Sequence, residues 1–193
     1  MTDYDKYDAL IFDLDGTLVD SMPAHYQAWQ QTAAEYGFEV DEAWYHTRGG
    51  SPAWLTAQSL IETFSLSVEP QVLADRKNQI FSELAEMEVV VLPAAEVAKT
   101  YAGRKPMAIG TGTLTDIADK LLKKAGLLEL FDVVVGADQV DAHKPSPDTF
   151  LKCAELLSVE SHQCLVFEDA PFGIQAAKAA GMDVIDVTDA KRV

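Results

Sequence analysis

The sequence predicts an α/β fold, and two observations lead to this prediction. Short apolar runs without polar alternation recur along the chain, and such runs are typical of strands buried on both faces. Helical patterns separate the later runs, and this alternation favours a parallel sheet covered by helices. The arrangement expected is a Rossmann-like parallel sheet flanked by helices. The predicted strands are residues 9–12, 106–109, 132–135, 164–167 and 184–187.

The predicted helices of the α/β part are residues 114–125, 148–157 and 173–180. Gly126 and Gly181 stand where the first and last of these helices are expected to stop.

Residues 21–90 break the alternation of strands and helices. Successive helical patterns cover residues 24–36, 53–64 and 72–86, with a turn-rich stretch at residues 48–52 between them. We therefore expect a small helical insertion over residues 21–90, placed after the first strand. The α/β core is expected to consist of residues 1–20 and 91–193.

Composition excludes several classes of function. The chain has 193 residues, 48% of them apolar, and 31 acidic against 15 basic residues give a net charge of -16. Nucleic acid and anionic membranes attract basic surfaces, so neither is an expected partner. A phosphate would need a cation in such an acidic protein.

We found no apolar stretch long enough to span a membrane and no secretory signal pattern, so a cytoplasmic protein is expected. Cys153 and Cys164 lie in apolar segments without metal-ligand spacing, and we expect buried thiols.

The first candidate motif is the pair Asp13 and Asp15, which directly follows the predicted first strand. Ligands of parallel sheets bind at the carboxyl ends of strands, and a spacing of two directs both side chains the same way. Two close carboxylates resist joint ionisation, so we expect one to keep a proton. Asp13 would attack phosphorus, while Asp15 would protonate the leaving oxygen and later deprotonate water. An ordinary acidic loop is the alternative.

The second motif, residues 107–113, is an apolar strand that ends in small residues before a helix. The Thr111 hydroxyl and the amides of Gly112 and Thr113 are donors near a helix N-terminus, where a phosphate is stabilised. A helix cap without a ligand is the alternative.

Two later motifs supply charge at the same edge. Lys144 stands in a proline-rich loop and would screen the repulsion between Asp13 and a phosphate, unless it is a surface lysine. Glu168 and Asp169 end another apolar strand. Hard oxygen ligands suit Mg²⁺, with Asp169 as ligand and Glu168 behind it.

Together, these four motifs resemble the haloacid dehalogenase superfamily of phosphotransferases along the whole chain. The resemblance implies Asp13 as nucleophile, Asp15 as acid and base, and Thr111 and Lys144 as phosphate binders. It also implies a Mg²⁺ held by Asp13, Asp169 and the main-chain carbonyl of Asp15. The helical insertion resembles the family's cap, which closes over the substrate.

Within the superfamily, the chain is similar to the β-phosphoglucomutase-like branch, because His25 and Trp29 follow the first motif in that branch's arrangement. One would touch substrate or steady Asp15, and the other would pack at the cap, with a plain cap-core pair as the alternative. Arg48 and Ser51 in the turn-rich stretch are further substrate candidates. The related mutases carry two cations for a second phosphate, at places that hold Pro52 and Leu114 here.

The predicted function is therefore a Mg²⁺-dependent phosphatase of small sugar phosphates, similar to bacterial enzymes acting on fructose 1-phosphate. A β-phosphoglucomutase and a non-catalytic phosphosugar-binding protein are the alternatives. The expected partner is a small phosphorylated sugar, and the expected assembly is a monomer or weak dimer.

Overall fold

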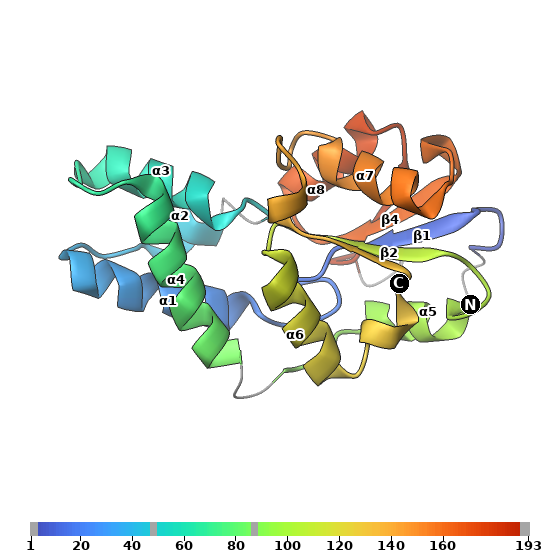
Figure 1. The fold of residues 1–193 in the computed structure, drawn as a ribbon, viewed down its shortest axis with the longest axis horizontal. Coiled ribbons are helices and arrows are strands. Elements are labelled where there is room, and N and C mark those ends of the chain that lie inside the picture. Colours follow the sequence, from blue (N-terminus) through green and yellow to red (C-terminus); the bar gives the residue numbers. More distant parts are fainter. Residues whose placement is uncertain (1–3, 47–49, 86–88, 190–193) are drawn as a thin grey trace.

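The computed structural model describes residues 4–46, 50–85 and 89–189. In this part of the chain, five parallel strands form one sheet in the order β3-β2-β1-β4-β5, so that the first strand lies at the centre (Figure 1). Phe12 of β1 lies beside Ile109 on one side and Phe167 on the other. The predicted parallel sheet is confirmed, and each strand end lies within one residue of its expected place. The strands are β1 (Ala9–Phe12), β2 (Met107–Gly110), β3 (Val133–Val135), β4 (Cys164–Glu168) and β5 (Asp183–Asp186).

Helices cover both faces of the sheet (Figure 1). Successive strand residues point to opposite faces, so Leu10 and Phe12 pack into the same buried cluster as residues of α5 and α6. Ala9 and Ile11 pack on the other face with residues of α7 and α8. Both faces of β1 are thus buried, which explains its continuous apolar run. The helices are α5 (Ala94–Tyr101), α6 (Thr115–Ala125), α7 (Asp148–Leu157) and α8 (Pro171–Ala179).

The chain between β1 and α5 forms a group of helices beside the sheet, drawn in blue to green in Figure 1. Trp29, Leu60 and Leu73 are buried at the centre of this group, in a cluster of its own. We call residues 21–90 the helical segment. Its helices are α1 (Met22–Tyr36), α2 (Glu42–His46), α3 (Ala53–Phe64) and α4 (Pro70–Ala85).

The structure adds helices that the sequence patterns did not predict. In the described part of the chain these are α2 and α5, with five and eight residues, and three short 3₁₀ helices. A helical apolar face shows clearly only over about 11 residues or more, so elements of one or two turns give a weak periodic signal. The 3₁₀ helices are Leu128–Leu130, Ala137–Gln139 and Ser161–Gln163.

Two neighbouring stretches of chain join the helical segment to the sheet. Val19, before α1, forms an antiparallel bridge with Val91, after α4. The amide of Asp20 donates to the carbonyl of Val90 at 2.9 Å, and the amide of Leu92 donates to that of Leu18 at 2.8 Å. We call these two stretches the paired linkers. The helical segment therefore leaves and rejoins the core at one place.

Smaller features also agree with the sequence analysis. Gly126 and Gly181 have φ values of 70° and 74° at the ends of α6 and α8, a conformation that favours glycine. Cys153 and Cys164 are buried free thiols, as expected. Over the ranges that the structure describes, no helix combines the length and the apolar character that a bilayer crossing requires.

Candidate active site

Asp13 lies directly beyond the carboxyl end of β1, at the centre of the sheet edge. Its backbone N–H donates to the carbonyl of Phe167 at 2.9 Å, so the pairing with β4 continues to this residue. Its side chain is buried, and the ends of β2 and β4 lie on either side of it. A carboxylate in this position can meet groups from several loops.

Lys144 provides a buried cation next to Asp13. Its Nζ lies 2.6 Å from Oδ1 of Asp13 and 2.6 Å from Oε2 of Glu168, and the residue is only 1% exposed. The ammonium group also lies 4.7 Å from the centre of the Phe150 ring. The surface-lysine alternative is therefore excluded. Burial alone would lower the pKa of Lys144, but the charges of Asp13 and Glu168 raise it above its ordinary value.

Glu168 is fully buried at the end of β4 and has a partner for each oxygen. Oε2 pairs with Lys144, and Oε1 accepts the backbone N–H of Ala170 at 3.0 Å. Gly173 of α8 makes room for it, because a Cβ at that position would lie 1.9 Å from Oε2.

Asp169 approaches the first motif from the β4 side. Thr17 Oγ1 donates to its Oδ1 at 3.0 Å. Gly16 has a φ of +90°, and a Cβ there would lie 2.4 Å from Asp169 Oδ2. Glycine is therefore required at position 16 both for the turn and for the approach of the carboxylate.

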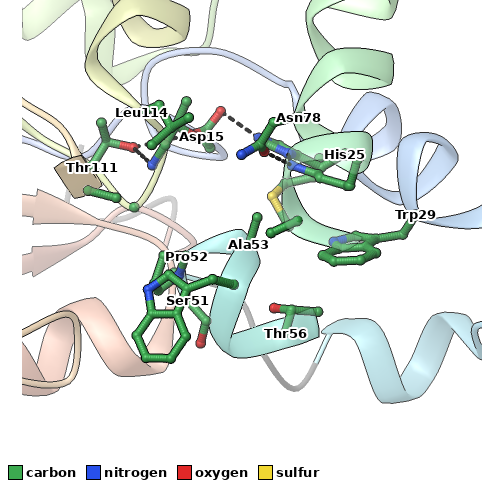
Figure 2. Close-up of a pocket in the computed structure, with 18 of the residues that line it drawn as sticks. Asp15, His25, Trp29, Ser51, Pro52, Ala53, Thr56, Asn78, Thr111 and Leu114 are labelled. Atoms are coloured by element: carbon green, nitrogen blue, oxygen red, sulfur yellow. Dashed lines mark hydrogen bonds and ion pairs between the residues drawn. The ribbon is translucent and has the colours of Figure 1, made fainter. Parts of the chain in front are cut away.

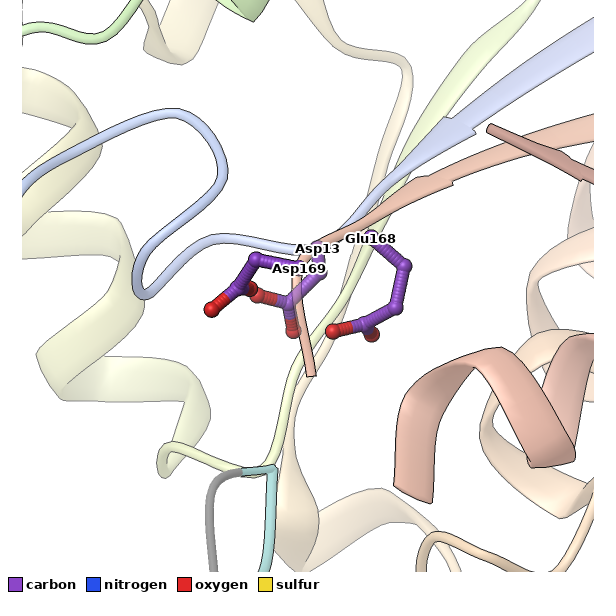
Figure 3. A group of neighbouring side chains, drawn as sticks. All are labelled: Asp13, Glu168 and Asp169. Atoms are coloured by element: carbon purple, nitrogen blue, oxygen red, sulfur yellow. The ribbon is translucent and has the colours of Figure 1, made fainter. Parts of the chain in front are cut away.

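The side chains of Asp13, Glu168 and Asp169 form one acidic cluster (Figure 3). Each offers an oxygen, and these oxygens all lie within 4.8 Å of one another. Burial and the charge of Glu168 raise the pKa of Asp13 to about 8, and burial and the charge of Asp13 raise that of Asp169 to about 7. Burial also raises the pKa of Glu168.

The acidic cluster fits a divalent cation. Its carboxylates face one lysine charge, and the raised pKa values reflect this excess of negative charge. Mg²⁺ prefers hard oxygen ligands and commonly takes only one or two protein carboxylates. Glu168 already receives two hydrogen bonds, so Asp13 and Asp169 are the better ligands. The donor set therefore suits the predicted metal.

Asp15 lies in a different environment, although it is only two residues from Asp13. Its Oδ1 accepts hydrogen bonds from Ser21 Oγ at 2.6 Å and His25 Nε2 at 3.0 Å. Its Oδ2 accepts from Thr111 Oγ1 at 3.2 Å and Thr113 Oγ1 at 2.7 Å. Burial alone would raise the pKa of Asp15, but His25 and the donating hydroxyls lower it below its ordinary value. An ionised carboxylate satisfies all four donors.

His25 connects Asp15 to a buried lysine that we did not predict. Lys77 Nζ lies 2.7 Å from His25 Nδ1, and Lys77 is 3% exposed. Both contacts of the ring are satisfied when Lys77 donates to Nδ1 and the Nε2–H donates to Asp15. Burial lowers the pKa of Lys77 to about 7. Phe81 stacks on the His25 ring at 3.6 Å between centroids and fixes its plane.

A sequence signal for Lys77 was present. Leu73 and Ala74, one turn earlier, and Ile80 and Phe81, one turn later, are all buried, so a lysine stands in the buried stripe of an amphipathic helix. Such a lysine needs a buried partner.

A cavity of about 90 Å³ lies between the core and the helical segment. Figure 2 shows Asp15 and Thr111 on its core side, with His25, Trp29 and Thr56 on the side of the helices. Asp13 reaches the same cavity. Side chains lining it that the sequence analysis did not single out are Met22, Tyr45, Ala53, Trp54, Thr56, Gln71, Ala74, Lys77, Asn78 and Ala137.

The second motif contacts both Asp15 and the helical segment. The hydroxyls of Thr111 and Thr113 donate to Asp15, and the amide of Thr113 donates to Thr111 Oγ1 at 3.0 Å. Gly112 lies against Gly50, whose carbonyl oxygen would be 3.0 Å from a Cβ at position 112. The phosphate-binding role of these residues stays a prediction.

The other predicted residues fall into two groups. Trp29 and Ser51 line the cavity, and Trp29 also packs in the cluster of the helical segment. Arg48 lies outside the described residues. The structure brings the remaining predicted residues to one place: Asp13, Asp15, Thr111, Gly112, Thr113, Lys144, Glu168, Asp169 and His25.

Comparisons with known proteins agree with this geometry. A family model described as haloacid dehalogenase-like hydrolase matches residues 7–181. The chain is 47% identical to "Fructose-1-phosphate phosphatase YqaB" of Escherichia coli (strain K12), over 95% of this chain and 98% of that protein. It is 34% identical to "Phosphorylated carbohydrates phosphatase" of Thermotoga maritima, over 92% and 83% of the two chains. A crystal structure of β-phosphoglucomutase from Clostridium difficile has a TM-score of 0.83 at 25% identity, covering 97% of this chain and 88% of that one.

Proposed function

Because this chain belongs to the haloacid dehalogenase-like hydrolases and is a phosphatase, we propose that it hydrolyses small sugar monophosphates such as fructose 1-phosphate. We further propose that the reaction depends on Mg²⁺ and passes through a phosphorylated Asp13. The name of the relative at 47% identity supports the choice of sugar.

One observation carries the proposal. Asp13, Glu168 and Asp169 gather around a buried Lys144 at the sheet edge, and Asp13 also reaches the cavity. Structural ion pairs do not need three crowded carboxylates, and crowding of this kind is a common mark of functional sites. The arrangement supports a nucleophile held beside a cation.

Asp13 is proposed as the nucleophile. An oxygen of its carboxylate attacks phosphorus and forms a new P–O bond, while the bond between phosphorus and the sugar oxygen breaks. Lys144 stabilises the ionised carboxylate before the attack and the phosphoryl oxygens during it. When bound by Asp13 and Asp169, Mg²⁺ would supply further positive charge against the phosphoryl oxygens.

Asp15 and His25 are proposed to transfer the proton that the departing sugar oxygen needs and that the attacking water later returns. The departing sugar oxygen takes a proton from Asp15. Because the resting Asp15 is ionised, that proton reaches it along the contacts from Lys77 to His25 Nδ1 and from His25 Nε2 to Asp15, which leaves this chain of residues one proton short. A water molecule then attacks phosphorus, gives its proton to Asp15, and breaks the bond between phosphorus and Asp13. Inorganic phosphate leaves, and both carboxylates return to their starting state. The contact of 3.0 Å between His25 Nε2 and Asp15 Oδ1 supports this sharing.

The cavity favours a substrate with one phosphate. Among its described lining residues, the basic side chains are His25 and Lys77, and both are engaged in the contacts that lead to Asp15. The rest of the sugar would meet neutral groups such as Thr56, Gln71 and Asn78. Neutral hydrogen-bonding groups match sugar hydroxyls better than a second phosphate.

Phosphate release from a panel of sugar phosphates tests the proposal. Fructose 1-phosphate, fructose 6-phosphate, glucose 6-phosphate and β-glucose 1-phosphate are compared by kcat/KM, with Mg²⁺ and with EDTA. We expect release that requires Mg²⁺ and is fastest with a small ketose or polyol phosphate. No release from any member would refute the proposal.

Mutase activity is the alternative raised by the structural similarity to a β-phosphoglucomutase. Conversion of β-glucose 1-phosphate to glucose 6-phosphate with little free phosphate would establish it and overturn net hydrolysis.

A further inference from the structure

The helical segment touches the core loops at Gly50 as well as at the paired linkers. Gly50 lies against Gly112, as described above, and a Cβ at position 50 would lie 3.3 Å from the Cβ of Ala170 and 3.9 Å from the Cδ of Lys144. These core residues belong to three different loops of the site. The short stretch from Gly50 to Trp54 is therefore where the helical segment closes against the catalytic loops.

Trp54 makes the side-chain contact of this closure. It lies in the first turn of α3, lines the cavity and is 36% exposed. Its ring meets that of His143 at 5.8 Å between centroids and an angle of 68°. Edge-to-face pairs of this geometry are favourable. Because a large exposed apolar ring has an unfavourable contact with water, this pairing favours the closed arrangement.

His143 brings the contact with Trp54 next to Lys144 of the candidate active site. It directly precedes Lys144, whose Nζ bridges Asp13 and Glu168. His143 itself is absent from the lining of the cavity in the described residues, so it acts on the site through its neighbour. A ring that packs on His143 can therefore restrict the loop that carries the lysine.

The paired linkers can act as a hinge between the helical segment and the core. A body joined to the core by two adjacent stretches can rotate about them, and hinges of this kind are formed by a few residues at element ends. Ile80 and Phe81 of α4 pack with the core cluster that also contains Leu18 and Val19, so this packing lies near the linkers. A contact between the helical segment and a core loop outside the linkers resists such a rotation.

We propose that Trp54 and His143 form an aromatic clasp that holds the helical segment closed over the cavity and positions the Lys144 loop for phosphoryl transfer. Both are positioning residues, since neither needs to touch the reacting atoms. The inference rests on the proposed function for its kinetic consequence, but the closure itself can be measured without substrate.

A double-mutant cycle tests the clasp. We compare Trp54→Ala, His143→Ala and the double variant with the wild type, using kcat/KM for phosphate release from fructose 1-phosphate. Each single change is expected to lower kcat/KM about 2- to 12-fold, the range that an aromatic pair contributes to an equilibrium. The double variant is expected to be no slower than the slower single variant. Effects that multiply would overturn the clasp.

Conservative variants and matched controls distinguish loss of the Trp54–His143 contact from a general loss of folding stability. Trp54→Phe and His143→Phe keep a ring at each position and should retain most of the activity. Trp44→Phe in α2 and His162→Gln in an exposed 3₁₀ turn should leave kcat/KM unchanged. Thermal unfolding of every variant is recorded. A loss in the ring-retaining variants equal to that of the alanine variants would contradict the proposal.

Hydrogen exchange provides a test without substrate. In Trp54→Ala and His143→Ala, we expect faster exchange in residues 50–54 and 143–146, with the strands unchanged. Unchanged exchange in both stretches would overturn the clasp even in an active enzyme. Conversely, if the wild type releases no phosphate from fructose 1-phosphate, the proposed substrate is wrong, and the exchange result still decides whether the clasp exists.

Discussion

The surroundings of Asp13 and of Asp15 differ sharply, although both residues follow the same strand. Asp13 lies among core residues, where Glu168 and Asp169 crowd it and Lys144 compensates only partly. Asp15 faces hydroxyls of the second motif and His25 of the helical segment. The pKa of Asp13 is raised to about 8, whereas that of Asp15 is lowered. Identical side chains thus acquire opposite proton affinities.

This difference shows that residues distant in sequence decide the protonation of each carboxylate. The helical segment contributes Ser21 and His25 to Asp15, while the ion pairs of Asp13 come from the core. Movement of the helical segment is therefore expected to alter the proton affinity of Asp15 more than that of Asp13.

The largest expected effect is from Asp13→Asn. Phosphate release should fall by roughly 10⁴-fold or more, because the variant lacks the nucleophile. Thermal stability should change little, since the substitution keeps the volume of a crowded carboxyl group. Asp116→Asn on the exposed face of α6 is the control. A folded variant that still forms a phosphorylated protein, detected by mass spectrometry, would contradict the role of Asp13.

The next largest effect is expected from removal of Mg²⁺, which tests the surroundings of Asp13. EDTA should lower phosphate release at least about 100-fold, and added Mg²⁺ should restore it. Mg²⁺ should also raise the thermal unfolding temperature, because a cation that binds only the folded protein adds about 2.7 kcal/mol at 100 times its Kd. Asp169→Asn should weaken this shift. Full activity in EDTA would exclude the metal.

Asp15→Asn is expected to slow turnover of sugar phosphates about 10²- to 10⁴-fold. With p-nitrophenyl phosphate the leaving group needs no proton, so phosphorylation of Asp13 should largely recover while hydrolysis stays slow. Rapid-quench measurements should then show a burst of p-nitrophenol. Equal slowing of both half-reactions with this substrate would show that Asp15 has a positioning role only.

The last expected effect concerns stability instead of turnover, and it is a change in pH dependence caused by Lys77→Met. The folded protein lowers the pKa of Lys77 from 10.5 to about 7, so between these pH values the unfolded chain binds a proton that the folded chain lacks. The stability of the wild type relative to the variant should therefore rise with pH across this window, by up to about 4 kcal/mol. Denaturant titrations at pH 7 and pH 10 measure it. Lys120→Met, at an exposed position, is the matched control.

The convergence of the motifs could be predicted because parallel strands place their carboxyl ends at one edge. The order of strands and loops is enough to predict that Asp13, Lys144 and Asp169 lie at the same edge of the sheet. The place of Glu168 behind the metal ligands stays a prediction: one of its oxygens lies within 4.8 Å of oxygens of Asp13 and Asp169, but both of its oxygens already accept hydrogen bonds.

The proton distribution was not predictable from the pair Asp13 and Asp15 alone. We expected mutual repulsion to separate their protonation states. In the structure, burial and Glu168 affect the pKa of Asp13 more than Asp15 does. Lys77 and Trp54 were also missed, because their partners His25 and His143 are distant in sequence and meet them only through tertiary packing.

The paired linkers have a consequence for how the protein can vary. Since the ends of the helical segment lie beside each other at Val19 and Val91, the distance that any replacement must span is short. Insertions at such places are tolerated, because the strands keep their register whatever length of chain is placed between them. Chimaeras can be made in which the corresponding region of a relative replaces residues 21–90. We expect them to fold and to prefer a different sugar phosphate, while the residues at the sheet edge still carry out phosphoryl transfer.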